Sequence, residues 1–580
     1  MARAQGRAIP HHWRGWTTGS RRLPCASASW EGEPADATGL RRPGNREGGL
    51  PLSSLGRIRA ATARRAKPRV AVIGAGPGGL AAALLLARAG AETIVFERGD
   101  TVGGRTRTLV TPEGYRFDLG PTFFLYPRIL REIFAACGAR LEDHVELKRL
   151  DPAYRLVFEG DGQLDAAADV GRLEAAIARL APADARNLQA YLADNRTKLK
   201  AFGPVLARPF GRLGDFLAPE ILRAFRFMRP FRSVDRDLAR YFADPRIRLA
   251  FSFQTKYLGM SPFRCPSLFT ILSFLEHEHG VYHPIGGCGA VSEAMAALAR
   301  GLGAEFHLAT EVDRLEYAGG RPVAVEAAGR RVPVDAVVVN ADFAHAVPRL
   351  IPDAHRPRWR DRKLGRARLS CSTFMLYLGV EGEVRGLPHH TILLARDYMR
   401  NIREIENGIL PREPSIYVQH AGATDLGMAP KGHTSLYVLV PVPNLRARID
   451  WQEEAPRYRA TVLERLALLG LIGLESRIRY QRIVTPQHWQ NEFAVGQGAT
   501  FNLAHDLLQM LYFRPHNRFA PGLYLVGGGT HPGSGLPVIY EGARITARLA
   551  LQDLGLDPGL ILPPKSVGTE LLPAPEGMAA

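Results

Sequence analysis

Three glycines and one acidic residue have the types and the spacing of a site for a dinucleotide. Gly74, Gly76 and Gly79 form the pattern G-x-G-x-x-G. The first glycine permits a tight turn, the second lets the backbone approach a pyrophosphate, and the third lets a helix pack closely on a strand. Glu97 follows about 20 residues later, where a carboxylate can accept hydrogen bonds from ribose hydroxyls. An acidic residue there argues against an NADP 2′-phosphate.

The residues around these glycines predict the strand, helix and strand that must hold them. Residues 70–73 and 93–96 are short apolar runs that are typical of buried parallel strands. A helix from about Gly78 to residue 88 is apolar nearly all round, so we expect it to be buried, with its N-terminal N–H groups facing the phosphates. Arg98 is expected beside the ligand. Glycine-rich turns are common, but this context favours a dinucleotide site over a purely structural turn.

A second pair of glycines follows the predicted second strand. Gly103 and Gly104 allow another close backbone approach to a pyrophosphate, and Arg105 can offset the charge of that group. Thr106 and Gly120, which lies in a Phe-Asp-Leu-Gly-Pro segment, complete this part of the expected site. The combination favours FAD over NAD, and the alternative is an arginine-rich surface turn.

A third glycine-rich turn lies near the C-terminal end, in the sequence GLYLVGGGTHPGSGLPVIYEGARI of residues 522–545. It predicts a short strand over 523–526, a turn, and a helix from about residue 538. Glycines let the backbone approach a flat ring, and a helix N-terminus can place positive potential beside the pyrimidine side of a flavin. The residues expected to contact the cofactor here are Gly528, Gly529, Gly535, Leu536, Pro537 and Val538.

The motifs at both ends of the chain resemble those of a known superfamily. The first resembles the flavin amine oxidase and phytoene desaturase superfamily, in which the arginine after the paired glycines, here Arg105, lies along FAD. The last closely resembles the signature of bacterial-type phytoene desaturases and related carotenoid oxidoreductases. Segments 282–289 and 311–315 fit as well, and the resemblance implies that the backbone of Val312 contacts the adenine. It covers about residues 69–555.

The resemblance implies an FAD-dependent oxidoreductase of carotenoid biosynthesis. Its substrate would be a long isoprenoid or polyene, phytoene or a C30 analogue, desaturated by hydride transfer to the flavin, with oxygen or quinone as the electron acceptor. An apolar channel would provide specificity, because a hydrocarbon offers no charged handle. Such substrates reside in the bilayer, so we expect a cytoplasmic protein that is attached peripherally to a membrane surface.

No catalytic triad is expected of such an enzyme, and none is visible in the sequence. Arg155, His283 and Glu541 are polar candidates for an acid or base near the site, and their roles stay open. His283 also follows two other histidines closely, but the spacing is not H-E-x-x-H and no cysteine pair supports it, so we expect no metal.

Three alternative functions remain open at this point. A carotenoid isomerase or a retinol-saturase-like enzyme would share the whole architecture but give no net oxidation. A flavin amine oxidase would share the first motif but need an aromatic cage beside the flavin. A non-catalytic flavin-bound or membrane-binding protein is the third alternative, although the intact glycines at both ends argue for a retained cofactor.

One segment suggests a membrane contact. Residues 206–242 mix aromatic side chains with arginines, which suits either an amphipathic helix at a membrane interface or a core helix with solvated arginines on its outer face. The two interpretations have equal weight. Residues 261–275 are strongly apolar and are expected to line a channel.

We predict an α/β fold: a Rossmann-type FAD-binding domain, a substrate domain with a mixed sheet, and a helical subdomain that would associate with a membrane. The expected parts are a disordered extension (1–66), three FAD-binding parts (67–160, 285–345 and 501–555), a helical substrate or membrane region (161–284), a substrate-domain sheet (346–500) and a disordered tail (556–580). The extension could equally be a transit peptide or precede the real start.

Composition fits this interpretation. The chain has 580 residues, of which 46% are hydrophobic and 23% charged, as in ordinary globular proteins. The net charge is +18, but residues 1–68 hold twelve arginines and one lysine against four acids, which is half of the excess. Basicity is therefore weak evidence for nucleic acid, and we expect no such partner. The five cysteines are scattered, which argues against a disulfide framework.

Overall fold

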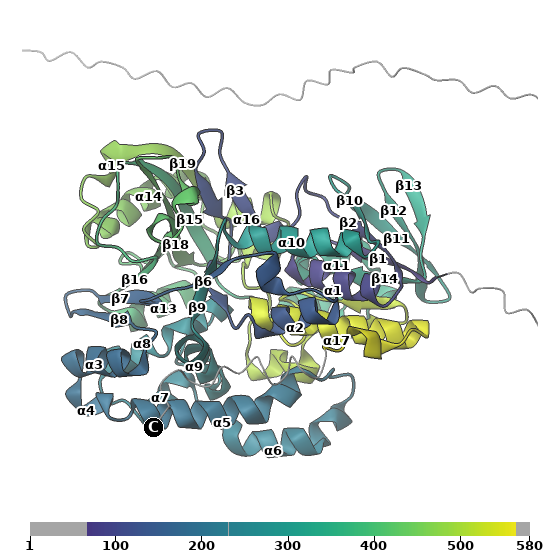
Figure 1. Cartoon of the computed structure of the whole chain (residues 1–580), viewed down its shortest axis with the longest axis horizontal. Helices are drawn as coiled ribbons and strands as arrows, with labels where there is room; N and C mark the ends of the chain where they lie inside the picture. The colour runs from purple at the N-terminus through teal and green to yellow at the C-terminus, as the bar shows by residue number, and fades with distance from the viewer. Residues whose placement is uncertain (1–66, 230, 564–580) are drawn as a thin grey trace, which may run out of the picture. The chain divides into compact units, whose positions relative to one another are not determined.

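The computed structural model describes residues 67–229 and 231–563. Its first sheet holds the glycine-rich turns (Figure 1), and its strands run in the order β10-β2-β1-β14-β21-β20. All neighbours pair in parallel except β20 and β21. The strands are β1 (Arg69–Ile73), β2 (Glu92–Phe96), β10 (Glu305–His307), β14 (Ala336–Val339), β20 (Arg518–Ala520) and β21 (Leu523–Leu525). Both faces are covered, which explains the continuous apolar runs of β1 and β14.

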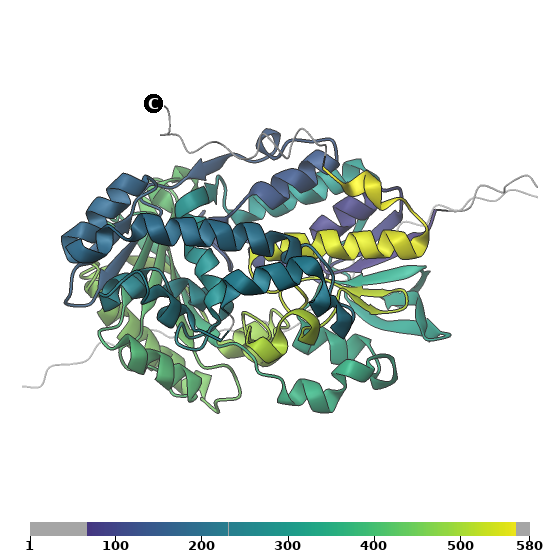
Figure 2. The same ribbon diagram turned by 90° about the horizontal axis from the view of Figure 1, so that it is seen from below.

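Helices cover one face of this sheet and a small antiparallel sheet lies on the other. Helix α1 is buried from Gly78 to Ala87, as its uniformly apolar sequence predicts, and it packs against α10 and α17 (Figure 2). The elements around the sheet are α1 (Pro77–Arg88), α2 (Arg128–Ala136), α10 (Cys288–Gly301) and α17 (Leu536–Leu554) on one face, and β11 (Val312–Ala318), β12 (Arg321–Ala327), β13 (Arg330–Pro333), α11 (Phe343–Leu350) and α12 (Asp361–Arg366) on the other.

The second sheet has the order β19-β15-β18-β17-β16-β7-β8. It is mixed, because β7 and β16 pair in parallel while the other neighbours are antiparallel. Its strands are β7 (Tyr154–Phe158), β8 (Gln163–Ala166), β15 (Ser372–Glu381), β16 (His390–Leu394), β17 (Ile416–His420), β18 (His433–Val442) and β19 (Ile478–Val484), with α13 (Tyr398–Glu406), α14 (Trp451–Ala467), α15 (Leu474–Arg477) and α16 (Pro486–Asn491) around them. Strand β7 thus belongs to this sheet, although it lies within the part predicted to bind FAD.

A helical region follows β8, seen from below in Figure 2. It comprises α3 (Val170–Leu180), α4 (Pro182–Ala185), α5 (Leu188–Leu206), α6 (Pro219–Met228), α7 (Val234–Leu238), α8 (Pro245–Ala250) and α9 (Thr270–His279). Short strands β5 (Phe124–Leu125), β6 (Leu147–Arg149) and β9 (Val281–Pro284) form a third sheet, and β3 (Thr108–Val110) pairs with β4 (Arg116–Asp118).

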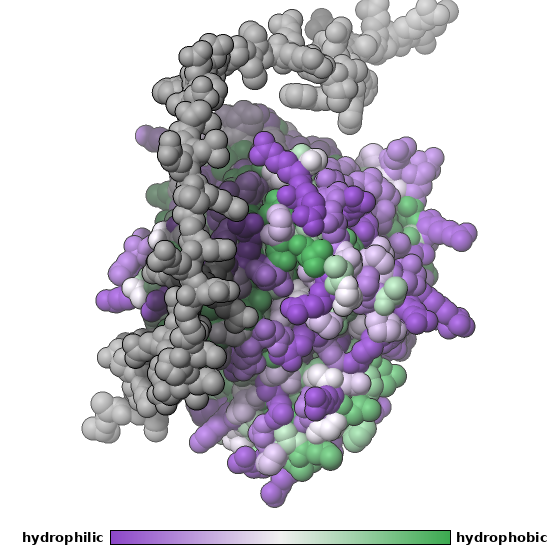
Figure 3. Space-filling model, turned by 90° about the vertical axis from the view of Figure 1, so that its right-hand side faces the viewer, coloured by the Kyte–Doolittle hydropathy of each residue, from purple (hydrophilic) through white to green (hydrophobic). Residues whose placement is uncertain are grey.

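The segment 206–242 contains α6, which has one buried side and one exposed side. In α6, Ile221 and Ala224 are buried while Leu222 is 52% exposed. Arg229 is structural, since it pairs with Asp194 and Asp237 at 2.6 Å each. Figure 3 shows hydrophobic side chains at the lower edge of its view, the level at which Figure 1 draws α6.

None of the helices within the described residues is both long enough and apolar enough to cross a bilayer. The predictions for residues 1–66 and for most of 556–580 lie outside the described residues.

Candidate active site

A cavity of about 800 Å³ runs from the carboxyl ends of β1 and β2 to the face of the second sheet. Its wall combines the three glycine-rich turns, strands β16, β17 and β18, and the helices α5 and α9. This position, outside the carboxyl ends of parallel strands, is where α/β folds bind nucleotide ligands.

Glycine is required in the first turn because backbone and side-chain atoms crowd it. Gly74 has a φ of +98°, and a Cβ there would lie 2.3 Å from the Asn340 carbonyl oxygen. A Cβ on Gly79 would lie 2.1 Å from the carbonyl oxygen of Gly74. Asn340 follows β14 and donates from Nδ2 to the Gly74 carbonyl at 3.0 Å. Sequence reasoning did not single out Asn340, although a polar residue at the carboxyl end of an apolar strand is the signal that could have found it.

Glu97 is fixed at the end of β2 by backbone donors. Its Oε2 accepts from the N–H of Ala75 at 2.7 Å, and its Oε1 accepts from the N–H of Gly99 at 2.8 Å. Arg98 and Val312 line the same end of the cavity. The carboxylate therefore connects the end of β2 to the first glycine turn.

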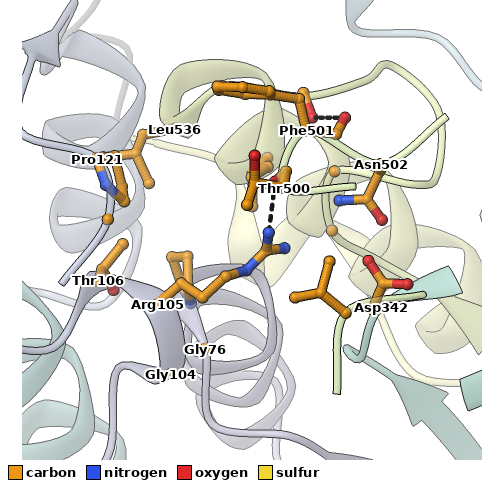
Figure 4. Close-up of a pocket in the computed structure, with 18 of the residues that line it drawn as sticks. Gly76, Gly104, Arg105, Thr106, Pro121, Asp342, Thr500, Phe501, Asn502 and Leu536 are labelled. Carbon is orange, nitrogen blue, oxygen red and sulfur yellow. Dashed lines mark hydrogen bonds between the residues drawn. The ribbon is translucent and has the colours of Figure 1, made fainter. Parts of the chain in front are cut away.

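Arg105 lies between the first sheet and a distant loop (Figure 4). Its Nη1 donates to the carbonyl oxygen of Thr500 at 2.6 Å. Burial lowers the pKa of Arg105, and the nearby Asp342 carboxylate opposes this shift. Burial likewise raises the pKa of Asp342, opposed by Arg105. The two charges thus face one cavity and partly compensate each other.

A fully buried arginine supports the C-terminal turn. Arg514 donates to the carbonyl oxygens of Gly528 at 2.6 Å and Thr530 at 3.2 Å. Burial lowers the pKa of Arg514 to about 9. Ser534 Oγ also donates to the Phe501 carbonyl at 2.9 Å, which ties the turn to the loop that meets Arg105. Sequence reasoning missed Arg514 and this loop, because neither carries a local pattern.

The second sheet forms a wall with two tyrosines, Tyr417 and Tyr437, whose ring centroids lie 5.7 Å apart. The Tyr437 hydroxyl donates to the Gly120 carbonyl at 2.7 Å, and the Tyr417 hydroxyl lies 2.6 Å from Thr122 Oγ1. Farther along, the wall is apolar; Phe202, Leu206, Leu268, Phe269, Leu272, Leu275, Met510 and Leu511 form it. Part of the segment 261–275 thus lines the channel, as its sequence predicted.

Most residues expected at the cofactor come together on this wall. They are Gly74, Gly76, Glu97, Arg98, Gly104, Arg105, Thr106, Gly120, Val312, Gly528, Gly535, Leu536, Pro537 and Val538. Four of the expected residues lie behind the wall instead, where they permit close packing: Gly78, Gly79, Gly103 and Gly529. A Cβ on Gly529, for example, would lie 2.5 Å from the Phe343 Cβ.

The structure places none of the three acid or base candidates on the cavity wall. Arg155 is held by both oxygens of Asp165, at 2.6 and 2.8 Å. His283 Nε2 lies 3.3 Å from Asp425, and Glu541 lies 3.0 Å from Arg544. Each is engaged by a neighbour that a linear sequence pattern does not reveal. Within the described residues, no three His, Cys, Asp or Glu side chains are grouped to hold a metal ion.

Residues 77–551 match the family described as flavin containing amine oxidoreductase. The chain belongs to this family. It is 42% identical to a 4,4′-diapophytoene desaturase (4,4′-diapolycopene-forming) of Methylomonas sp, over 83% of this chain and 95% of the relative. It is 39% identical to an all-trans-zeta-carotene desaturase of Myxococcus xanthus (84% and 94%), and 37% identical to a lycopene-forming phytoene desaturase of Pseudescherichia vulneris (84% and 99%).

These relatives confirm the resemblance seen in the sequence: the protein is an FAD-dependent oxidoreductase of phytoene desaturase type. The fold also matches solved structures. Putrescine oxidase bound to putrescine superposes with a TM-score of 0.57 at 17% identity, covering 84% of this chain and 99% of that one. An oxidoreductase from Methanosarcina mazei gives 0.54 at 18%, with 82% and 98% covered.

The described residues fit FAD, the cofactor of this family. A Cβ on Gly104 would lie 3.5 Å from the Cα of Gly76, so the two glycine turns face each other across a narrow gap that side chains would fill. Arg105 and the N-terminal end of α17 line the same cavity. A narrow polar gap beside a wider apolar space suits a pyrophosphate joined to a flat ring.

Proposed function

We propose that this protein desaturates a long isoprenoid hydrocarbon, phytoene or its C30 analogue, in carotenoid biosynthesis. The observation that carries the proposal is the continuity of the cavity: the polar gap at the glycine turns opens into an apolar section lined by Phe202, Leu272 and Met510. Such a wall suits a hydrocarbon, which cannot be held by charge. The names of the relatives support this substrate class.

The glycine turns and their neighbours are proposed to hold FAD. Glu97 would accept from the ribose, and the Val312 backbone would contact the adenine. The turns at Gly76 and Gly104 would receive the pyrophosphate, with Arg105 offsetting its charge. The remaining contacts would come from Gly74, Arg98, Thr106, Gly120, Gly528, Gly535, Leu536, Pro537 and Val538. When bound, FAD supplies the acceptor for a hydride.

The protein's own contribution is positioning and exclusion of water. The apolar section would hold the polyene straight, so that successive bonds can be placed beside the flavin. The side chains of Ile392, Met375 and Leu439 on the second sheet would close this space against solvent. Channel length and width, rather than hydrogen bonds, would then select the chain length of the substrate.

The protein is also proposed to attach to the surface of a membrane in the cytoplasm, with oxygen or a membrane quinone as electron acceptor. Exposed apolar side chains surround the same apolar cluster that ends the cavity. They are Leu213, Leu217, Leu222, Phe225, Phe227, Phe231, Leu507, Leu508 and Phe513, called here the apolar rim. The exposed arginines Arg223 and Arg226 lie among them and would meet anionic head groups.

Amine oxidation is the second candidate, because Tyr417 and Tyr437 form an aromatic pair on the cavity wall. The Tyr437 hydroxyl donates to the Gly120 carbonyl oxygen, and the Tyr417 hydroxyl lies beside Thr122 Oγ1. The cavity wall beyond the two tyrosines is apolar. Amine-dependent hydrogen peroxide formation by the purified protein is therefore expected to be absent, and its detection would favour this candidate.

A pigment profile tests the desaturase proposal. Residues 60–580 would be expressed in one bacterial host that makes phytoene and in another that makes its C30 counterpart. Coloured products with more conjugated double bonds are the expected result, and the responsive host sets the chain length. Colourless precursor in both hosts, with a yellow FAD-bound protein in hand, would overturn the proposal. Products with unchanged or fewer double bonds would instead indicate an isomerase or a saturase.

A further inference from the structure

A chain of polar side chains leads from the cavity wall into the second sheet. Tyr417, on β17, lines the cavity, and its hydroxyl lies 2.6 Å from Thr122 Oγ1 and 2.9 Å from Nδ1 of His390. His390 is fully buried behind the wall, stacked on the ring of Phe123 with 4.1 Å between centroids. The hydroxyl of Tyr417 thus lies between the Thr122 hydroxyl and the His390 imidazole, beside a cavity lined mostly by apolar side chains.

The surroundings keep this pair neutral. Burial raises the pKa of Tyr417 well above its ordinary value, so the phenol retains its proton. Burial, followed by the neighbouring His283, lowers the pKa of His390 well below its ordinary value. A neutral imidazole has one nitrogen free to accept a proton, and Nδ1 is the nitrogen that faces Tyr417.

We propose that Tyr417 is the catalytic residue that accepts the proton lost by the substrate, and that His390 takes the proton that Tyr417 gives up. This inference rests on the proposed desaturation. One C–H bond of the substrate would break with its electron pair leaving as hydride, for which bound FAD would supply the acceptor. The neighbouring C–H bond then breaks, its electrons form the new C=C bond, and its proton forms an O–H bond with Tyr417 Oη. The original phenolic proton moves to His390 Nδ1.

A weak base is sufficient for this step. A carbon that has lost hydride makes the neighbouring C–H bond strongly acidic, so the requirement is a lone pair at the right place rather than a high basicity. Removal of the phenolic proton by His390 as the new O–H bond forms avoids a charged tyrosine in the apolar cavity. His390 therefore acts through Tyr417 and is a positioning and relay residue.

Four other polar groups on the cavity wall are less suited to accept this proton: Tyr437, Lys256, Glu97 and Asp342. The Tyr437 hydroxyl donates to the carbonyl oxygen of Gly120, which cannot take a proton onward. Lys256 is protonated at neutral pH, since burial lowers its pKa only to about 8. Glu97 and Asp342 lie with the glycine turns, at the end of the cavity assigned to the cofactor.

The cluster continues from His390 to two further buried histidines and a buried carboxylate. The His390 ring lies 4.5 Å from that of His389, and His389 lies 4.6 Å from His283, between ring centroids. His283 Nε2 contacts Asp425 Oδ2 at 3.3 Å. Although burial alone would raise the pKa of Asp425, the Gly286 N–H and His283 hold it below its ordinary value. The Asp425 carboxylate therefore stays negatively charged at the end of the cluster, where it would offset the charge of a proton that the cluster holds, and His283 gains a role at a distance from the substrate.

Tyr417→Phe tests the proposal, with Tyr458→Phe as the matched control. Tyr458 is buried in α14, its hydroxyl has no partner within the described residues, and it does not line the cavity. We expect about a hundredfold loss of kcat in Tyr417→Phe, the low end of the effect of a proton acceptor, with KM unchanged. A substrate deuterated at the carbon that loses the proton should show a larger isotope effect in Tyr417→Phe than in the wild type.

His390→Leu and the double variant test the relay. Because both residues handle one proton, the double variant should lose no more activity than Tyr417→Phe. The ¹⁵N NMR spectrum of histidine-labelled, FAD-bound protein gives a readout that is independent of activity. The signal of the unprotonated Nδ1 of His390 should shift in Tyr417→Phe and should stay in place in Tyr458→Phe.

The outcomes separate this inference from the function on which it rests. A wild type that converts neither phytoene nor its C30 analogue overturns both. An active wild type together with an equally active Tyr417→Phe, and an unchanged isotope effect, overturns the role of Tyr417 alone. Additive losses in the double variant, or a His390 Nδ1 that carries the proton, overturn the relay.

Discussion

At the scale of single residues, Lys256 has surroundings that suit its charge poorly. It lines the cavity, it is half-buried, and its ammonium lies 4.9 Å from the centroid of the Tyr398 ring. Burial lowers the pKa of Lys256 to about 8, and the nearby Cys371 opposes this shift. Folding below that pH must therefore bury a charge that water would solvate better.

Lys256→Met is expected to raise the free energy of unfolding at pH 7 by about 1 to 3 kcal/mol. Below pH 8 both the folded and the unfolded wild type hold the proton, so the full cost of burial is present. Between pH 8 and about 10.4, the ordinary pKa of lysine, the unfolded chain still binds a proton that the folded protein has lost, so wild-type stability rises with pH.

The gain from Lys256→Met should therefore shrink across that window. Urea unfolding of the FAD-bound protein at several pH values measures it. Lys200→Met, at an exposed position of α5, is the control and should show no such trend. A variant whose advantage grows above pH 8 would contradict the assigned direction.

The site could be predicted from sequence where residues act through their own neighbours in the chain. Gly74, Gly76 and Glu97 belong to one strand, turn, helix and strand, so their spacing carries the information. Asn340 reaches the first glycine turn from the end of β14, 266 positions after Gly74, and no local pattern marks so distant a partner. Arg514 supports the C-terminal turn from the loop before β20, where no sequence motif includes it. His283 was noticed for its type, but its contact with Asp425 could not be read from spacing.

At the scale of elements, the junction of β1 and α1 depends on how closely the helix approaches the strand. The Cβ of an alanine at position 79 would lie 2.1 Å from the Gly74 carbonyl oxygen, a backbone atom that cannot move alone. Gly79→Ala should therefore cost at least about 3 kcal/mol of stability and give little folded protein.

Gly301→Ala is the matched control, because Gly301 ends α10 and a Cβ there meets nothing within 4 Å. Alanine favours the helix by up to about 1 kcal/mol, so this variant should be neutral or more stable. Thermal unfolding of both variants makes the comparison. A Gly79→Ala protein as stable as the control would show that the turn can open without cost.

The same scale explains which elements the sequence revealed. The parallel strands of the first sheet are apolar throughout, and their periodicity is unambiguous. Strand β7 lies in a part predicted to bind FAD, because its place in the second sheet depends on pairing with β16, which lies more than 200 residues farther along. The 206–242 segment divides into α6 and α7 with irregular stretches around them, because Arg229 takes a left-handed conformation after α6 and pairs with Asp194 and Asp237.

At the scale of the whole molecule, the apolar rim and the cavity suggest one path for a hydrocarbon. The rim residues of α6 lie over the cluster of Phe202, Ile221 and Met510, and this cluster continues into the cavity wall. A substrate leaving a bilayer at the rim would then stay in apolar surroundings until it reached the flavin. Apolar side chains that stayed exposed to water on this surface would instead promote aggregation.

Leu222→Ser with Phe225→Ser should weaken binding to anionic lipid vesicles at least tenfold, because each side chain contributes about 1.5 kcal/mol or more when it enters the lipid. The control is Leu468→Ser with Ile472→Ser, two apolar residues in the loop after α14 that are at least as exposed but lie outside the rim. Cosedimentation with vesicles measures the binding of both double variants.

Activity on a substrate dissolved in detergent should be unchanged in the rim variant, since its cavity is intact. Activity on a substrate within vesicles should fall together with vesicle binding. Equal vesicle binding by the two double variants would show that this surface does not face the membrane.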